Sequence, residues 1–344
     1  MLAGCYTALV TPFSEGGIDQ QGLAQLVAFQ IENGVDGILA VGTTGESPVL
    51  SWKEHNQVIE FVANSTRAKA LCIAGVGSNN TTETLAASKH AVASGAEALL
   101  LVDPYYNGPS SLEIRREYVE PVATAFPDTA IIPYVIPGRT GAQLLPEDLA
   151  LLFRDHANVS TVKEATANVD NMRRTRACCG VDFTILSGDD GMTHQMLSDP
   201  DIAAAGVVSV VSNIAPKAVG DMVRHFKAGR PEAAQVLNTA LAPLFGLVTI
   251  KTTEETEFGQ VVCRARNPLG IKTLMQIMGM PSGPCRQPLG RMTRKGLEEV
   301  LAAARKVWTE TPEILQPAAD FFNLDIVARL DDPANWRQLF YETY

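Results

Sequence analysis

The sequence predicts an α/β fold, a (β/α)8 TIM barrel with a C-terminal helical subdomain. Short apolar runs recur along the first two thirds of the chain, and the segments between them have helical periodicity and helix caps. Strands that alternate with helices form parallel sheets. Eight such units in roughly 230 residues fit a closed barrel, for which about 250 residues is typical. A doubly wound open sheet is the alternative, but no Gly-x-Gly-x-x-Gly follows the first apolar run, which disfavours its dinucleotide-binding form.

Each of the apolar runs has the length and the aliphatic or β-branched content of a buried strand. The expected strands are Tyr6–Val10, Gly37–Val41, Ala70–Ala74, Ala98–Val102, Ala130–Val135, Val159–Lys163, Phe183–Leu186 and Gly206–Val210. In a barrel of this kind the carboxyl ends of all strands meet at one rim, and the active site is built there.

The segments between the strands carry helix signals. Asp19 is placed to cap a helix that ends at Gly34. Ser51 and Glu54 form a capping box at the start of the next helix. A third helix is expected over Thr82–Ser94. These helices supply the outer layer that a parallel barrel needs.

The pattern changes after residue 228. Three helices are expected there without strands between them: Glu232–Leu247, Pro268–Met278 and Thr293–Val307. We therefore expect a barrel over residues 1–228, a helical subdomain over residues 229–307 and a C-terminal extension over residues 308–344. The extension is rich in aromatic residues, which favours packing on its own subunit or on a neighbour over disorder.

Composition limits the possible functions. The chain has 344 residues, of which 46% are hydrophobic and 19% charged, and its net charge is −10. A net negative charge disfavours nucleic acid and anionic membranes as partners. The chain shows no signal peptide, and no apolar run reaches the ~18 residues that span a bilayer. The six cysteines have no Cys-x-x-Cys spacing and are expected to be reduced thiols of a cytoplasmic protein.

Lys163 closes the sixth expected strand, at the end of a β-branched run. Burial disfavours an ammonium group and lowers its pKa, and a neutral amine can attack a carbonyl to form a Schiff base. The alternative for this stretch alone is a lysine that reaches the surface or pairs with Glu164. The other strand ends decide between these interpretations.

Three further strand ends carry polar groups that fit an imine-forming amine. Thr43 and Thr44 follow the second strand, Tyr105 and Tyr106 follow the fourth, and the fifth carries Tyr134 and leads to Arg139. Tyrosine and threonine hydroxyls can relay protons, and an arginine can hold a carboxylate with two parallel hydrogen bonds. Taken singly, each motif could be a turn, a packing contact or a surface ion pair. Their convergence on one rim predicts an active site.

The motifs resemble those of the dihydrodipicolinate synthase / N-acetylneuraminate lyase family. The matching segments are Thr7–Phe13, Gly42–Pro48, Pro104–Asn107, Tyr134 with Pro137–Gly141, Val162–Thr166, Ser187–Asp190, Gly206–Ser209, Asn213, and Asn267-Pro268 with Lys272. The resemblance covers about residues 2 to 305. It implies a Schiff-base lyase of the class I aldolase type that condenses pyruvate with L-aspartate-4-semialdehyde in lysine and diaminopimelate biosynthesis. It implies no metal and no organic cofactor.

The resemblance also implies residue roles. Lys163 would form the imine, and Tyr134, Thr44 and Tyr106 would relay protons, with Tyr106 reaching across a subunit boundary. The residues implied for substrate binding are Thr43 and Thr44 with the Val208 carbonyl for pyruvate, and Arg139, Gly188 and Asp189 for the aldehyde. The paired threonines and Arg139 favour the synthases over the sugar-acid lyases. Val135 and Gly108 depart from the usual family residues, which are Asn and Lys.

Two alternatives to this function stay open. One is another pyruvate-dependent aldolase that acts on a 2-keto-3-deoxy sugar acid, N-acetylneuraminate or 4-hydroxy-2-oxoglutarate, and the other is a non-catalytic barrel that binds a keto acid. The resemblance further implies a homotetramer built as a dimer of dimers. It also suggests an L-lysine inhibitor site at Ser47, Pro48, Trp52, His55, Asn79, Glu83 and Tyr105. Core packing of the Trp52 helix is the alternative interpretation of that cluster.

Overall fold

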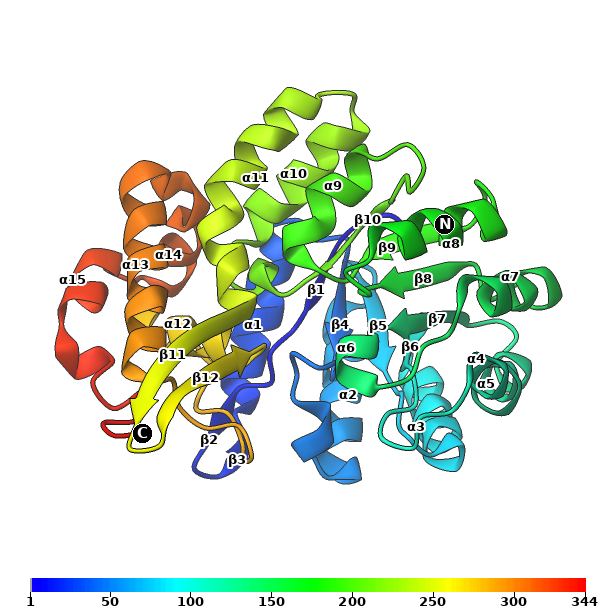
Figure 1. Ribbon diagram of the computed structural model, residues 1–344, viewed down its shortest axis with the longest axis horizontal. Helices are drawn as coiled ribbons and strands as arrows, with labels where there is room; N and C mark the ends of the chain where they lie inside the picture. The colour runs from blue at the N-terminus through cyan, green and yellow to red at the C-terminus, as the bar shows by residue number, and fades with distance from the viewer. Residues whose placement is uncertain (1) are drawn as a thin grey trace.

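The computed structural model describes residues 2–344 and contains a closed barrel of eight parallel strands (Figure 1). Neighbouring strands follow one another in chain order around the ring, and β1 pairs with both β4 and β10 to close it. The barrel strands are β1 (Gly4–Ala8), β4 (Gly37–Ala40), β5 (Leu71–Gly75), β6 (Ala98–Val102), β7 (Ala130–Val135), β8 (Thr161–Glu164), β9 (Thr184–Ser187) and β10 (Gly206–Ser209). The predicted barrel and its eight strands are confirmed, with bounds that shift by one or two residues.

Helices surround the barrel. They are α1 (Gln20–Glu32), α2 (Trp52–Thr66), α3 (Thr81–Ser94), α4 (Ser111–Glu113), α5 (Glu120–Ala125), α6 (Pro137–Thr140), α7 (Pro146–Asp155), α8 (Val169–Cys179), α9 (Thr193–Ser198) and α10 (Pro216–Lys227). The predicted caps are present: the Asp19 carboxylate accepts from the Gly22 N–H at 2.8 Å, and Ser51 and Glu54 form the capping box of α2. These caps satisfy N–H groups that would otherwise lack partners at the helix start.

The hydrophobic core has two layers. Inside the barrel, side chains from alternating strand positions such as Leu39, Ile73 and Ile132 pack with the Tyr134 ring. A larger layer fills the space between the outer surface of the barrel and the helices. Because the interior is filled, the barrel is a rigid frame and its open end, where the strands finish, is left for the site.

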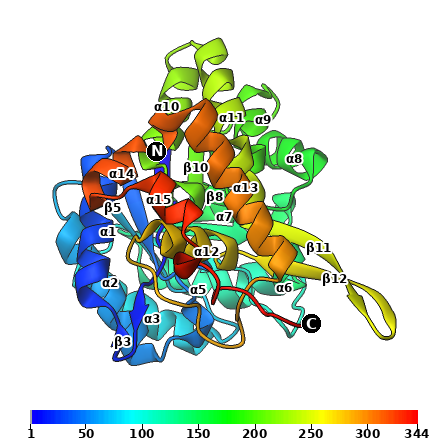
Figure 2. The same ribbon diagram turned by 90° about the vertical axis from the view of Figure 1, so that its left-hand side faces the viewer.

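Three C-terminal helices are confirmed: α11 (Pro231–Phe245), α12 (Leu269–Met278) and α13 (Arg294–Glu310). The prediction that no strands lie between them is wrong. β11 (Thr249–Thr256) and β12 (Gly259–Arg266) form an antiparallel hairpin that projects from the body of the molecule (Figure 2). The segment is rich in threonine and valine, which favour strands, but its polar residues hide the apolar alternation by which a strand is recognised. A second short hairpin joins β2 (Phe13–Ser14) to β3 (Gly17–Ile18).

The C-terminal extension packs on its own chain. It forms α14 (Gln316–Phe322) and α15 (Ile326–Asp331) beside α1, α12 and α13 (Figure 2). Phe321 and Phe322 lie against Phe29 of α1, with ring centroids 5.3 and 5.1 Å apart. Phe321 and Phe322 thus pack against the core, whereas Tyr341 and Tyr344 are exposed. Within residues 2–344, no helix is long and apolar enough to cross a membrane.

Candidate active site

The carboxyl ends of the barrel strands enclose a cavity of about 290 Å³. Among its lining residues are seven that the sequence analysis selected: Thr43, Thr44, Tyr134, Arg139, Lys163, Gly188 and Asp189. They come from the loop after β4, the end of β7, helix α6, the end of β8 and the loop after β9. The barrel topology therefore brings together groups that lie far apart in the sequence.

Lys163 lines this cavity with a buried amine. The residue is 5% exposed, and its Nζ atom lies 4.0 Å from the centroid of the Tyr134 ring. Burial lowers the pKa of the Lys163 ammonium to about 7, with the negative charge of Asp190 opposing the shift and Arg139 reinforcing it. A substantial fraction of the amine is therefore uncharged and nucleophilic at neutral pH.

Gly188 makes room for this lysine. A Cβ atom at position 188 would lie 3.1 Å from both Cγ and Cε of Lys163 and 2.8 Å from the Cβ of Ala165. The Gly188 N–H also donates to the Glu164 carbonyl at 2.7 Å, which holds the loop against β8. The glycine is thus required by the close approach of the loop to the lysine side chain.

Asp190, which the sequence analysis did not select as a site residue, supplies a buried carboxyl group near Lys163. It accepts hydrogen bonds from the Ser209 hydroxyl and from the N–H groups of Val210 and Val211. Burial raises the pKa of this carboxyl to about 6, against the effect of these hydrogen bonds. Its position in the Ser187–Asp190 motif at the end of β9 could have identified it as a site residue. The sequence analysis used that motif only for the family resemblance.

Tyr134 is buried, and burial raises the pKa of its hydroxyl to about 12. The phenol is therefore protonated at neutral pH and is able to donate its proton to a developing anion. Thr44 lines the same cavity and is 2% exposed. Its hydroxyl accepts a hydrogen bond of 2.9 Å from the side-chain amide of Asn267, which fixes the orientation of the threonine.

Arg139 extends from α6 along the wall of the cavity and stays partly open to solvent. Its Nη2 group donates to the Asn267 carbonyl at 3.3 Å. Partial desolvation lowers the pKa of the guanidinium, and the charge of Arg266 adds to this effect while Tyr134 opposes it. Two arginines therefore flank one part of the cavity, where they can receive an anion.

Two predicted residues are not in the cavity of this chain. The Tyr106 side chain is 91% exposed, and its backbone has a φ of 80°, in the left-handed region. Val208 is buried in the interior of the barrel, and Val210 lines the cavity instead. The sequence analysis did not select the remaining lining residues, although three of them (Gly138, Ala165 and Asn267) lie in its matching segments. The other six are Ile136, Val248, Thr249, Lys251, Arg264 and Arg266.

A separate cavity of about 170 Å³ contains all seven residues of the predicted effector cluster. Trp52 and His55 pack edge to face, with ring centroids 4.9 Å apart, and Glu83 accepts a hydrogen bond of 2.7 Å from Ser78. Burial lowers the pKa of His55 to about 4, so its ring is neutral. Among the described residues, no hydrogen-bond partner reaches its Nδ1 atom.

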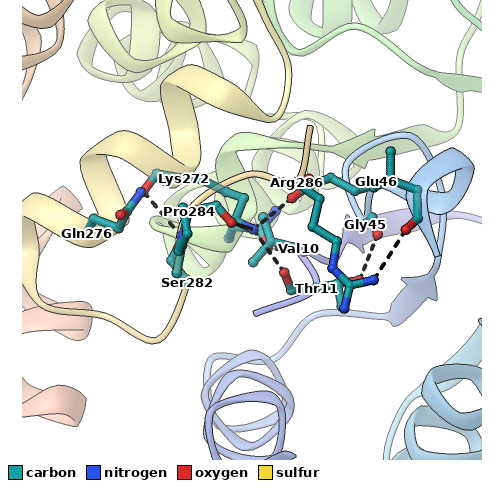
Figure 3. A network of polar contacts seen from close by, with 12 residues as sticks. Val10, Thr11, Gly45, Glu46, Lys272, Gln276, Ser282, Pro284 and Arg286 are labelled. Atoms are coloured by element: carbon teal, nitrogen blue, oxygen red, sulfur yellow. Dashed lines mark hydrogen bonds and ion pairs between the residues drawn. The ribbon is translucent and has the colours of Figure 1, made fainter. Parts of the chain in front are cut away.

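A buried polar network joins the loop after β4 to the C-terminal region (Figure 3). Glu46 follows the Thr43–Thr44 turn and forms an ion pair of 2.7 Å with Lys272 of α12, and both side chains are almost fully buried. The N–H of Arg286 donates to the second carboxylate oxygen of Glu46 at 2.8 Å, and its guanidinium pairs with Glu54 of α2. Because breaking one partner of a buried pair leaves an uncompensated charge, this network holds the turn firmly against the C-terminal region.

The comparisons with known proteins agree with this geometry. A profile of the dihydrodipicolinate synthetase family matches residues 1–307. The chain belongs to this family. A relative from Methanococcus vannielii, named 4-hydroxy-tetrahydrodipicolinate synthase, is 39% identical over 293 residues, which cover 85% of this chain and 94% of the relative.

Solved structures in the family have the same fold. The 4-hydroxy-tetrahydrodipicolinate synthase from Methylacidiphilum fumariolicum SolV has a TM-score of 0.83 at 33% identity and covers 92% of this chain and 99% of its own. A dihydrodipicolinate synthase from Cyanidioschyzon merolae, described with lysine bound, has a TM-score of 0.80 at 33% identity, covering 89% of this chain and 98% of its own. The family match ends at residue 307, so the extension over residues 308–344 lies outside it.

Proposed function

We propose that the protein is a Schiff-base lyase that condenses pyruvate with L-aspartate-4-semialdehyde to 4-hydroxy-tetrahydrodipicolinate, in lysine and diaminopimelate biosynthesis. The observation that carries the proposal is the buried Lys163 amine against the Tyr134 ring, at the open end of the barrel. Membership of the dihydrodipicolinate synthetase family and the names of the relatives support the same reaction.

The residues fit each step of this reaction. The neutral amine of Lys163 attacks the C2 carbonyl of pyruvate, and loss of water gives an imine. Removal of a proton from C3 gives an enamine, which attacks the aldehyde carbon and forms the new C–C bond. The amino group of the second substrate then attacks C2, closes the ring and releases Lys163. Tyr134 and Thr44, which line the same cavity, are proposed to move the protons at the carbinolamine and the alkoxide.

Substrate binding divides between two parts of the cavity. The Thr43–Thr44 turn is proposed to hold the pyruvate carboxylate through its N–H and hydroxyl groups, near the Val208 carbonyl. Arg139 is proposed to hold the carboxylate of the aldehyde, with Gly188 and Asp189 beside it. A coupled assay that offers pyruvate with each aldehyde in turn tests the proposal. Turnover of aspartate-4-semialdehyde supports it, whereas turnover only of aldehydes that yield sugar acids would assign the chain to the aldolase alternative.

The exposure of Tyr106 supports a role in a neighbouring subunit. The residue is 91% exposed within this chain and does not line its own cavity. We propose that Tyr106 enters the active site of a second copy and completes its proton relay, in a homotetramer built from two dimers. We also propose the division into residues 1–228, 229–307 and 308–344, with the extension packed on its own subunit.

L-Lysine is the proposed effector of the cavity around Trp52 and His55. Glu83 supplies an acid for an ammonium group, Asn79 supplies a polar side chain, and Trp52 supplies an apolar wall for the aliphatic chain. The C. merolae structure, described with lysine bound, supports this assignment. Steady-state rates measured with millimolar L-lysine test it against D-lysine as a control. Rates that L-lysine leaves unchanged would leave packing as the role of the cluster.

A further inference from the structure

The β11–β12 hairpin presents a cationic face to the active-site cavity. The register pairs Lys251 with Arg264 and Thr249 with Arg266, so these four side chains alternate onto the same face. All four line the cavity that contains Lys163. The hairpin is therefore part of the site, although residues 249–266 were not predicted to contribute to it.

The opposite face of the hairpin holds it in place. The Thr252 hydroxyl lies 3.0 Å from that of Thr293, and Glu254 forms an ion pair with Lys295 at the start of α13. Ile250 is buried against the C-terminal helices. Because one face of a two-stranded ribbon is docked on α13, the other is held toward the cavity.

The cations on the inner face are electrostatically uncompensated. Among residues 2–344, none of Arg139, Lys251, Arg264 and Arg266 forms an ion pair. Like charges directly opposite each other across two strands are destabilising, and Lys251 faces Arg264 in this way. Among the residues that the structure describes, Asp189 is the only acidic one that lines the cavity. A chain of net charge −10 thus concentrates unpaired positive charge at one opening.

The hairpin cations adjoin the arginine already assigned to the second substrate. Arg266 Nη1 donates to the carbonyl of Gly138 at 3.1 Å, one residue before Arg139. Arg139 donates to the carbonyl of Asn267, one residue after Arg266. Each arginine therefore donates to a backbone carbonyl next to the other arginine. The two guanidinium groups, one from α6 and one from β12, lie beside the same part of the cavity.

We infer that Arg266, Lys251 and Arg264 form an anion subsite with Arg139 that selects an acceptor aldehyde with an acid group at the end remote from its carbonyl. The inference rests on the proposed function and makes these hairpin residues determinants of substrate specificity. Arg266 and Arg139 hold the acid group, and Lys251 with Arg264 attract it from solvent. A carboxylate or a phosphate satisfies this chemistry, whereas a neutral polyol does not.

The test uses glutarate, a dicarboxylate, as a probe that does not depend on turnover. Glutarate is titrated calorimetrically into the full-length protein saturated with pyruvate. The test variants are Arg266→Gln and the double variant Lys251→Gln/Arg264→Gln. The control is Lys69→Gln/Lys227→Gln, which removes the same charge from exposed lysines outside the cavity. We expect wild type and control to bind glutarate equally, and both test variants to bind it at least about tenfold more weakly.

Thermal unfolding adds a readout that a merely structural role does not predict. Removing the Lys251–Arg264 repulsion is expected to raise the melting temperature of the free protein slightly, and glutarate is expected to stabilise the wild type more than the double variant. Equal glutarate affinity in all four proteins, or no glutarate binding by the wild type, would overturn the inference.

A panel of aldehydes distinguishes a carboxylate from a phosphate as the acid group. It also tests the subsite separately from the proposed function. Aspartate-4-semialdehyde, glyceraldehyde 3-phosphate and neutral glyceraldehyde are compared in wild type and the double variant. The subsite predicts that the double variant loses at least about tenfold in kcat/KM for an anionic aldehyde that the wild type uses, with little change for glyceraldehyde. Use of the phosphate aldehyde alone would refute the proposed synthase function but keep the subsite. An unchanged preference in the double variant would refute the subsite but keep the function.

Discussion

The Nζ atom of Lys163 lies 4.0 Å from the centroid of the Tyr134 ring, and the two residues are direct partners in the register of β7 and β8. Both side chains thus project from neighbouring strands of the barrel, and neither is carried by a loop. Burial lowers the pKa of the amine and keeps the phenol protonated. One strand pairing therefore brings together the proposed nucleophile and its proposed proton donor.

The reactivity of Lys163 is expected to follow pH through neutrality. Its pKa of about 7 means that the amine is protonated and unreactive below this pH and neutral above it. The rate of imine formation with pyruvate should therefore rise with pH and level off above about pH 8. Stopped-flow rates of adduct formation across this range measure the inflection. A profile that keeps rising toward pH 10 would mean that the amine is not desolvated.

Asp190 sets part of this inflection. Its negative charge raises the pKa of Lys163, so Asp190→Asn is expected to move the inflection to lower pH. Asp201→Asn, at an exposed position, serves as the control for loss of one acidic group. Equal inflections in the two variants would show that Asp190 acts only through its hydrogen bonds to Ser209, Val210 and Val211.

Gly188→Ala is expected to lower the rate of pyruvate adduct formation while the protein stays folded. The added methyl group would lie 3.1 Å from two Lys163 methylene carbons, so the lysine chain must shift. Small displacements of a catalytic group cost about tenfold to a hundredfold in rate. Gly138→Ala is a control on the same cavity, since no heavy atom lies within 4 Å of its added Cβ. Equal rates in both variants would contradict the packing argument.

Tyr134→Phe is expected to reduce kcat by about a hundredfold, because the variant loses the hydroxyl that is proposed to move protons at the imine. The fold should be retained, since the ring keeps its contacts inside the barrel. Steady-state rates and circular dichroism of the variant provide the comparison. A rate like that of the wild type would assign the proton transfer to another group.

Much of the fold and the site follows from local sequence pattern. The β-branched run that ends at Lys163 marks both a strand and a buried amine, and the apolar run before Thr43 marks another strand end. Since the barrel rim joins all strand ends, these positions predict one site. The hairpin over residues 249–266 was missed because its polar residues hide the apolar alternation of a strand. Its orientation depends on Thr293 and Lys295, at the start of a helix that follows later in the chain.

Contacts between distant parts of the chain could also not be predicted from the sequence. Asn267 orients Thr44 across 223 residues, and Lys272 neutralises Glu46 across 226 residues. An asparagine or a lysine in the sequence does not predict a buried partner, because both residue types are most often exposed. Tyr106 shows the same limit in another form, since its proposed site belongs to a second subunit.

Asp103 predicts an unusual pH dependence of stability. Burial raises the pKa of its carboxyl to about 8, so the folded protein keeps a proton that the unfolded chain releases near pH 4. Because the native state then binds more protons, this group makes the free energy of unfolding fall as pH rises from about 4 to 8. Asp103→Asn should gain stability relative to the wild type over this range, by on the order of a few kcal/mol. Urea unfolding at pH 5 and pH 8 measures the difference, and parallel behaviour of the two proteins would contradict the neutral carboxyl.

Covalent trapping of pyruvate tests the central claim most directly. The protein is incubated with pyruvate and sodium borohydride, digested and analysed by mass spectrometry, with Lys163→Ala as the matched control. The amine geometry predicts a reduced pyruvate adduct on Lys163 in the wild type and no adduct in the variant. The second buried lysine, Lys272, should stay unmodified because its Nζ atom lies outside the active-site cavity, in a buried contact of 2.7 Å with Glu46. A wild-type protein that forms no adduct, or forms it on another lysine, would contradict the account.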